Sequence, residues 1–147
     1  MRYKKIKPQE MTESELREIW DTEYCRNRIT TFDGVKVACY VEMFDHIFFE
    51  SDDRKIKDKS ILSYNRLEKI YWIKDTLEDP EAILKKGWDR EQKKYFKDRR
   101  VAIVKGNYVV IIRFTKKLTA KLVTAYEKED ISNIMSAPNF EKTEDYF

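Results

Sequence analysis

Residues that interrupt regular structure are scarce in this chain, which has three glycines and three prolines among 147 residues. With so few turn formers, helices and hairpins are expected to dominate the fold. Hydrophobic residues make up 41% of the sequence, which excludes an intrinsically disordered protein. A chain of this length is expected to form a single domain, residues 1–147, with a hydrophobic core.

Long apolar runs are also absent. The sequence contains no stretch of eighteen apolar residues, which excludes a membrane-spanning helix and argues against a membrane partner. The basic N-terminal stretch MRYKKIKPQE is followed by no apolar run, so a secretory signal is not expected. A cytoplasmic location follows as the expectation.

Cysteine is rare too, and the two present, Cys25 and Cys39, match no zinc-binding spacing. Two reduced thiols are favoured, and a disulfide is the alternative if both flank a hairpin. The sequence has no glycine-rich phosphate loop and no dinucleotide fingerprint, and its carboxylates fall in solvated runs. We therefore expect neither a metal nor a cofactor.

Charge is distributed unevenly along the chain, although the net charge is only +3. Six acids and one arginine lie between Glu10 and Glu23, whereas the stretch from Arg99 to Tyr126 carries seven cations and no acid. From Glu127 onward, acids again dominate. A basic segment of this kind indicates a face that binds a polyanion. The alternative is a solvated sheet face whose lysines protect an edge from aggregation.

The N-terminal part predicts a helix followed by a hairpin. Thr12 and Glu15 form a capping box, and Leu16, Ile19, Trp20 and Tyr24 give an apolar stripe at helical spacing. Asp33-Gly34 is a strong hairpin signal between strands expected over Arg28–Thr31 and Val35–Val41. Next come an expected strand over Asp45–Glu50 and a charged loop over Ser51–Lys59.

The middle of the chain predicts two helices. The first begins after Ser60 or Ser63, and its buried side is formed by Leu62, Leu67, Ile70, Tyr71 and Ile73. Asp79 as N-cap and Pro80 at the first helical position predict a second, short helix that ends at Gly87.

The last part of the chain predicts successive antiparallel strands at Lys94–Phe96, Val101–Val104, Tyr108–Thr115 and Thr119–Tyr126. Gly106-Asn107 and Lys116-Lys117 are the expected turns. The polar tail over Lys128–Phe147 is expected to be a short helix or partly disordered. Helices separated from a run of antiparallel strands are typical of the α+β class.

Four residues are candidates for chemistry. His46, the one histidine, is either a structural residue among its apolar neighbours or a general base. Arg66 either pairs with an acid, faces solvent, or binds a phosphate. Thr124 and Tyr126 share one face of their strand, together with Leu118 and Leu122. Either Tyr126 packs its ring against the core with its hydroxyl in water, or both hydroxyls donate to a phosphate oxygen.

These residue types suit RNA cleavage without a metal. RNA carries its own nucleophile, the 2′-hydroxyl, and needs a base, cations around the phosphate and a proton donor for the leaving 5′-oxygen. DNA lacks that hydroxyl and is inert to this route.

The order of these motifs resembles the phage-associated nucleases of the barnase–EndoU–colicin D–RelE-like (BECR) superfamily. The resemblance is carried by FDHIFFES (44–51), SYNRLEKIYWIKDTLEDPEAIL (63–84), KKYFK (93–97), NYVVIIRF (107–114) and LVTAY (122–126). It covers most of the chain, although no single motif is specific.

The resemblance implies helices packed on one face of a twisted antiparallel sheet of about four strands. The nuclease core would span residues 28–127, with an N-terminal helical extension (1–27) and a polar tail (128–147). It also implies metal-independent endoribonuclease activity of the phage or toxin type, in a bacterial or phage-infected cell. Its partners would be RNA and a cognate inhibitor or immunity protein.

Carried over by position, His46 is the base, Arg66 and Thr124 hold the phosphate, and Tyr126 stacks or donates a proton. Further RNA contacts are expected from the cations Lys94, Arg99, Arg113, Lys116 and Lys121. A second histidine, present in EndoU-like relatives, is missing, so Tyr126, Lys121 or a water remains open as the acid.

Two other functions fit the same sequence. One is a non-catalytic nucleic-acid-binding module that uses the Arg99–Tyr126 face. The other is an interaction protein on the same fold.

Overall fold

The computed structural model describes residues 3–50, 61–89, 93–104 and 107–140. The expected loop over Ser51–Lys59, the turn residue Gly106 and the end of the tail lie outside these ranges. The helical elements are η1 (Pro8–Glu10), α1 (Glu13–Trp20), the π-helix η2 (Asp21–Cys25), α2 (Met43–Phe48), α3 (Tyr64–Leu67), α4 (Trp72–Glu78) and α5 (Ser132–Met135). The strands are β1 (Ile29–Thr30), β2 (Lys36–Ala38), β3 (Phe49–Glu50), β4 (Ile61–Leu62), β5 (Ile83–Asp89), β6 (Lys94–Val104), β7 (Tyr108–Lys116) and β8 (Thr119–Glu127).

The main sheet has six strands in the order β1-β2-β8-β7-β6-β5, and β3 pairs with β4 in a separate two-stranded sheet. Strands β5 to β8 form an antiparallel meander, whereas β2 pairs with β8 in parallel. The α+β class is confirmed. The expectation of about four strands, all antiparallel, is wrong, because the hairpin β1–β2 joins the sheet beside β8.

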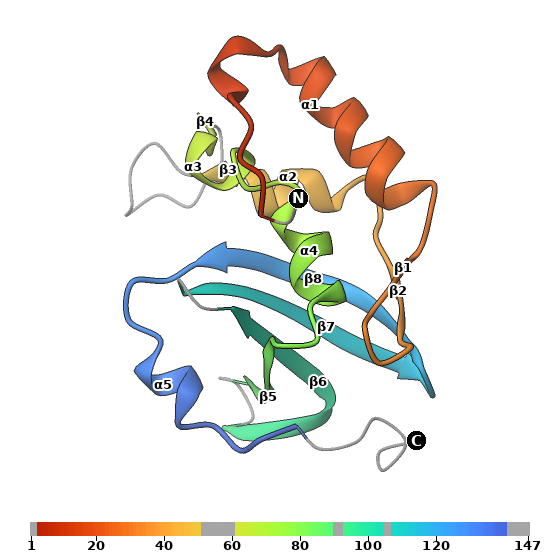
Figure 1. Cartoon of the computed structure of the whole chain (residues 1–147), viewed down its shortest axis with the longest axis vertical. Coiled ribbons are helices and arrows are strands. Elements are labelled where there is room, and N and C mark those ends of the chain that lie inside the picture. Colours follow the sequence, from red (N-terminus) through yellow and green to blue (C-terminus); the bar gives the residue numbers. More distant parts are fainter. Residues whose placement is uncertain (1–2, 51–60, 90–92, 105–106, 141–147) are drawn as a thin grey trace.

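The two faces of this sheet are covered differently (Figure 1). The face that we call inner packs under α1, α2, α3 and α4 and contains the main core. Its strand residues are Tyr108, Val110, Ile112 and Phe114 from β7 and Ala120, Leu122 and Ala125 from β8. On the opposite, outer face, Val101, Ile103 and Val109 form a smaller cluster with Ile131, Ile134 and Met135 around α5.

The N-terminal expectations are confirmed. The Thr12 side chain accepts a hydrogen bond from the Glu15 amide, and the Glu15 carboxylate accepts one from the Thr12 amide. Leu16, Trp20 and Tyr24 are buried in the main core. The Asp33-Gly34 hairpin forms, with strands shorter than expected, and Gly34 has a φ of +88°.

Three element assignments from the sequence are wrong. Of the strand or extended segment expected over Asp45–Glu50, only Phe49–Glu50 forms a strand, β3. Residues 43–48 form helix α2, because Phe44, Ile47 and Phe48 bury one helical face. The helix expected up to Glu78 is broken into α3 and α4. The helix expected from Pro80 to Gly87 is strand β5, since Asp79 accepts from the Glu81 and Ala82 amides and so forms a turn.

The remaining strands agree more closely with expectation. Tyr108–Lys116 and Thr119–Glu127 form the two long strands, and their turn is shifted by one residue to Lys117-Leu118. The two short strands expected at Lys94–Phe96 and Val101–Val104 are parts of one strand, β6. The tail contains α5, and its Phe140 is buried and stacks on Phe114 at 5.6 Å between ring centroids.

Candidate nucleic-acid interface

Three cationic side chains form a row across the outer face of the sheet. Arg99 on β6 lies opposite Arg113 on β7, and Arg113 lies opposite Lys121 on β8. Arg113 and Lys121 are exposed, and Arg99 is partly buried. Strands are spaced about 4.8 Å apart, so the row spans about 10 Å, and like charges placed directly opposite repel each other.

A β-bulge in β8 decides which residues share the outer face with this cation row. Ile111 pairs with Thr124, but the next residue, Ile112, pairs with Leu122, which makes Val123 the extra residue. The bulge therefore puts Lys121 and Thr124 on the same face although they are three residues apart.

The bulge also corrects one expectation. Leu122 was expected on the face of Thr124, but it is buried in the inner core. Leu118, expected on that face as well, is exposed in the β7–β8 turn with a φ of +57°.

Two hollows adjoin the cation row. The first, which we call the α2 hollow, has a volume of about 490 Å³ and is lined by Tyr40, Glu42, Met43, Arg99, Arg113, Lys121, Leu122 and Val123. The second, the α5 hollow, has a volume of about 500 Å³ and is lined by Lys86, Gly87, Arg99, Val101, Ile111, Val123, Tyr126, Lys128, Asn133, Ile134, Ser136 and Ala137. Arg99 and Val123 line both hollows, so the two hollows adjoin each other at the cation row.

Gly87 on β5 sets the position of Arg99. A Cβ atom at Gly87 would lie 2.3 Å from Cγ and 2.5 Å from Cδ of Arg99, far inside the normal contact distance of about 3.5–4.0 Å. The stem of Arg99 thus lies directly over the glycine, next to the register shift between Lys86 and Gly87. The sequence suggested a helix C-cap at Gly87, whereas its actual role is to make room for Arg99.

Thr124 and Tyr126 lie on the outer face, as the partners of Ile111 and Val109 in β7. Both are partly buried. Tyr126 packs against the small outer cluster and lines the α5 hollow. These two residues therefore share the face that carries the cation row.

His46 is exposed on α2, and α2 lies against β8. Met43, one helical turn before His46, lines the α2 hollow. Because residues three apart lie on neighbouring positions of a helix surface, His46 adjoins the side of α2 that faces this hollow.

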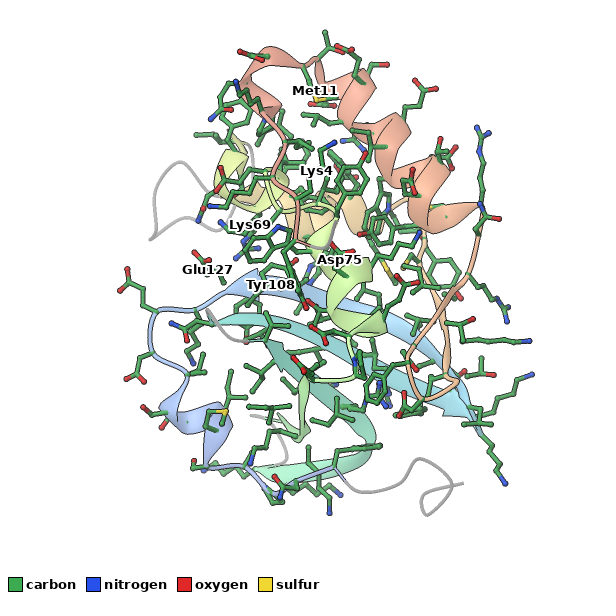
Figure 2. The ribbon with its side chains drawn as sticks, in the orientation of Figure 1. Lys4, Met11, Lys69, Asp75, Tyr108 and Glu127 are labelled. Atoms are coloured by element: carbon green, nitrogen blue, oxygen red, sulfur yellow. The ribbon has the colours of Figure 1, made fainter. Side chains whose placement is uncertain are left out.

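Arg66 lies on α3 and is not among the residues that line either hollow. Its Nη1 donates to the Ile47 carbonyl at 3.0 Å, which ties α3 to the last turn of α2. Burial raises the pKa of Tyr108 above its ordinary value. The charge of Arg66 partly opposes this rise, and the charge of Glu127 adds to it. Figure 2 shows Tyr108 near Lys69 and Glu127, whose charged atoms are 3.7 Å apart.

The other predicted RNA contacts lie at strand ends. Lys94 begins β6 opposite Asp89, and Lys116 ends β7 opposite Thr119. Both are exposed, and neither lines a hollow described above. Of the seven cations between Arg99 and Tyr126, Arg100 is buried on the inner face and Lys105 lies outside the described ranges.

Both cysteines are free thiols that are poorly suited to catalysis. Burial, with the nearby Asp21 and Glu42, raises the pKa of Cys25 to about 11. Burial also raises the pKa of Cys39 to about 12. In the described part of the chain, we find no group of three His, Cys, Asp or Glu side chains that could hold a metal ion. The described helices also include none with the length and apolar character needed to cross a bilayer.

Several lining residues were not foreseen from the sequence: Lys86, Gly87, Lys128 and Asn133. An isolated glycine inside a strand often marks a bulge or a close backbone approach, and this signal could have identified Gly87. The others come from β5 and the tail, which were expected as a helix and as a polar extension.

Comparisons with known proteins identify no relative. No protein-family model, no curated protein and no solved structure matches this chain. A functional assignment therefore depends on the geometry of the outer face and on the sequence motifs.

Proposed function

We propose that this protein binds single-stranded RNA on the outer face of its sheet. The observation that carries the proposal is the cation row, in which Arg99, Arg113 and Lys121 lie opposite one another on three adjacent strands. The described lining residues of the two hollows add Lys86 and Lys128 and include one acid, Glu42. Sequence-tolerant binding of single strands combines such a positively charged groove with aromatic residues, which Tyr126 and Tyr40 supply.

Salt dependence tests this binding. For a single strand, log K is expected to fall with log[salt] with a slope of about −0.7 per neutralised phosphate, so three phosphates give a slope of about −2. The double variant Arg113→Gln/Lys121→Gln is expected to reduce the slope to about −0.7. Anisotropy of a labelled RNA 12-mer at several salt concentrations measures both values.

The matched control is Lys4→Gln/Lys7→Gln, which also removes two exposed cations but from the N-terminal segment. Figure 2 shows Lys4 among the helices, away from the outer face. Equal effects of the two double variants, or no binding by the unmodified protein, would reject the proposal.

We further propose that the bound RNA is cleaved without a metal. The supporting observations are the resemblance to BECR nucleases and the exposure of His46 on the helix whose Met43 lines the α2 hollow. His46 removes the 2′-hydroxyl proton, and the 2′-oxygen attacks the phosphorus. The bond from phosphorus to the 5′-oxygen breaks, and that oxygen takes a proton from Tyr126, Lys121 or a water, which gives a 5′-hydroxyl and a 2′,3′-cyclic phosphate. Thr124 and the cation row hold the phosphate. Arg66 fixes the last turn of α2 through the Ile47 carbonyl and so positions His46.

Incubation of end-labelled RNA with the protein in excess EDTA tests the cleavage step. The expected products carry 2′,3′-cyclic phosphate ends, and His46→Ala is expected to abolish them while RNA affinity is unchanged. Arg66→Ala is expected to slow cleavage by about 10²-fold. Binding without cleavage would support the non-catalytic module, and neither binding nor cleavage would support an interaction protein.

A further inference from the structure

The α5 hollow combines an apolar floor with a cationic rim. Val101 and Ile111, from two adjacent strands, contribute to the floor, while Lys86, Arg99 and Lys128 bring positive charge to its edge. No carboxylate occurs among the described residues that line it. Its volume of about 500 Å³ lies within the usual range for small-molecule sites, about 300–1,000 Å³.

The segment that follows α5 is held against strand β5 by hydrogen bonds. The Lys86 amide donates to the Pro138 carbonyl at 2.9 Å, and the Phe140 amide donates to the Leu84 carbonyl at 3.1 Å. Lys85 Nζ donates to the Asn139 side chain at 2.7 Å, and Phe140 is buried. The segment after β8, residues 128–140, is therefore fixed against the sheet and forms one wall of the hollow.

Charge and shape together indicate the occupant. A nucleobase has apolar faces and a polar edge, and it is attached to a phosphate. The hollow supplies an aromatic ring from Tyr126, and Asn133 supplies an amide that can both donate and accept. Arg99, seated on Gly87, lies where this hollow joins the cation row, which is the place for the attached phosphate.

We infer that the α5 hollow is a nucleobase subsite for the bound RNA strand, an inference that rests on the proposed RNA binding. The base stacks on Tyr126, Asn133 reads its polar edge, and Arg99 binds the phosphate that links this nucleotide to the next one along the cation row.

Competition binding with three unlabelled 10-mers of equal charge tests the subsite: oligo(A), oligo(U) and an abasic ribose-phosphate 10-mer. Stacking is worth about 1–3 kcal/mol per base, so the better of the two base-containing 10-mers is expected to bind at least about 5-fold more tightly than the abasic one. Tyr126→Ala is expected to remove this difference and to leave the salt slope unchanged. The control Tyr64→Ala removes an exposed tyrosine from α3 and is expected to preserve the difference.

Asn133→Ala provides a second test, because Asn133 is exposed and its loss leaves the fold intact. The variant is expected to change the ratio of oligo(A) to oligo(U) affinity severalfold without changing abasic binding. Asn27→Ala, at an exposed position after η2, is the control and is expected to keep the ratio.

The outcomes separate the two proposals. Equal binding of all three 10-mers by the unmodified protein, with the expected salt slope, overturns the subsite and leaves RNA binding in place. A base-dependent difference that survives both Tyr126→Ala and Asn133→Ala also overturns the subsite. Failure of every 10-mer to bind overturns the proposed function itself.

Discussion

Two neighbouring arginines on β6 show how the two faces of the sheet differ. Arg99 points to the outer face, where it lines both hollows. Arg100 points to the inner face and is 1% exposed. It donates to both carboxylate oxygens of Asp33, at 2.6 and 3.3 Å, and its guanidinium lies within 6 Å of the Phe114 and Phe140 rings.

Arg100 therefore stabilises the folded structure. Its hydrogen bonds to Asp33 join the β1–β2 turn to β6, and its charge acts on the Asp33 carboxylate. Burial alone would raise the pKa of Asp33, but the hydrogen bonds and charge of Arg100 outweigh burial and keep that pKa below its ordinary value. The cations of one basic segment are therefore divided between the buried inner face and the outer face of the sheet by the alternation of the strand.

Among these variants, Asp33→Ala is expected to cause the largest loss of unfolding free energy, because it leaves the buried Arg100 without its carboxylate partner. Loss of one partner from a buried pair costs about 3–5 kcal/mol, which urea unfolding followed by circular dichroism measures. Glu81→Ala, an exposed acid in the turn before β5, is the control. A cost below about 1 kcal/mol would mean that the pair contributes little to the inner face.

Gly87→Ala tests the link between β5 and the outer face. The added methyl group overlaps the Arg99 stem, so we expect a cost of about 1–3 kcal/mol and weaker RNA binding. In an Arg99→Ala background, Cγ and Cδ are gone and most of the stability cost is expected to disappear. If the cost persists in that background, Gly87 is required by the backbone and not by Arg99.

Alkaline pH is expected to weaken the inner side of the protein. The pKa values of Cys25 and Cys39 are raised to about 11 and about 12, whereas an unfolded thiol titrates near 8.5. Because the folded state favours the protonated thiols, this stabilisation is present below about pH 8.5 and is lost as the pH rises through the folded values.

Urea midpoints measured from about pH 8 to about pH 11 are expected to fall, and less steeply in Cys25→Ala/Cys39→Ala. Some slope should remain in that variant, since burial also raises the pKa of Tyr24 and Tyr108. A midpoint that stays constant over this range would contradict the prediction.

Arg113→Gln is expected to have the smallest effect on stability, within about 0.5 kcal/mol, because Arg113 is exposed on the surface of the sheet. Its effect should appear instead as a decrease of about 0.7 in the salt slope of RNA binding. A loss of stability above about 1 kcal/mol would place Arg113 with Arg100 among the structural arginines.

The sequence predicted those elements that local chemistry determines. The capping box at Thr12 and the Asp33-Gly34 turn depend on nearby residues. The strands expected over Tyr108–Thr115 and Thr119–Tyr126 are β-forming runs bounded by turn signals, and they form with nearly these bounds. The strand expected at 45–50 is wrong for residues 45–48, because Phe44, Ile47 and Phe48 have helical spacing. Periodicity alone cannot distinguish a helix from a strand in such a short apolar run. The helix expected after Pro80 failed because Asp79 forms a turn that leads into strand β5.

The candidate site was predictable only in part, because its geometry depends on contacts between distant strands. The basic segment indicated a cationic face. The placement of Arg99, Arg113 and Lys121 directly opposite one another depends on the register in which their strands pair. Simple alternation also misplaced Leu122, because nothing in the sequence marks the extra residue at Val123. The contact between Gly87 and Arg99 joins two strands and becomes visible only in the folded chain.

The parallel pairing of β2 with β8 joins Lys36 to Thr119 and Ala38 to Lys121. During synthesis, the β1–β2 hairpin is made well before β8. The backbone groups on the edge of β2 that pair with β8 therefore have no strand partner until β8 has been synthesised. Pairings between such distant segments form slowly, and until then both strand edges are open to other chains. The amount of newly made protein that folds is therefore expected to depend on how long the edge of β2 stays unpaired.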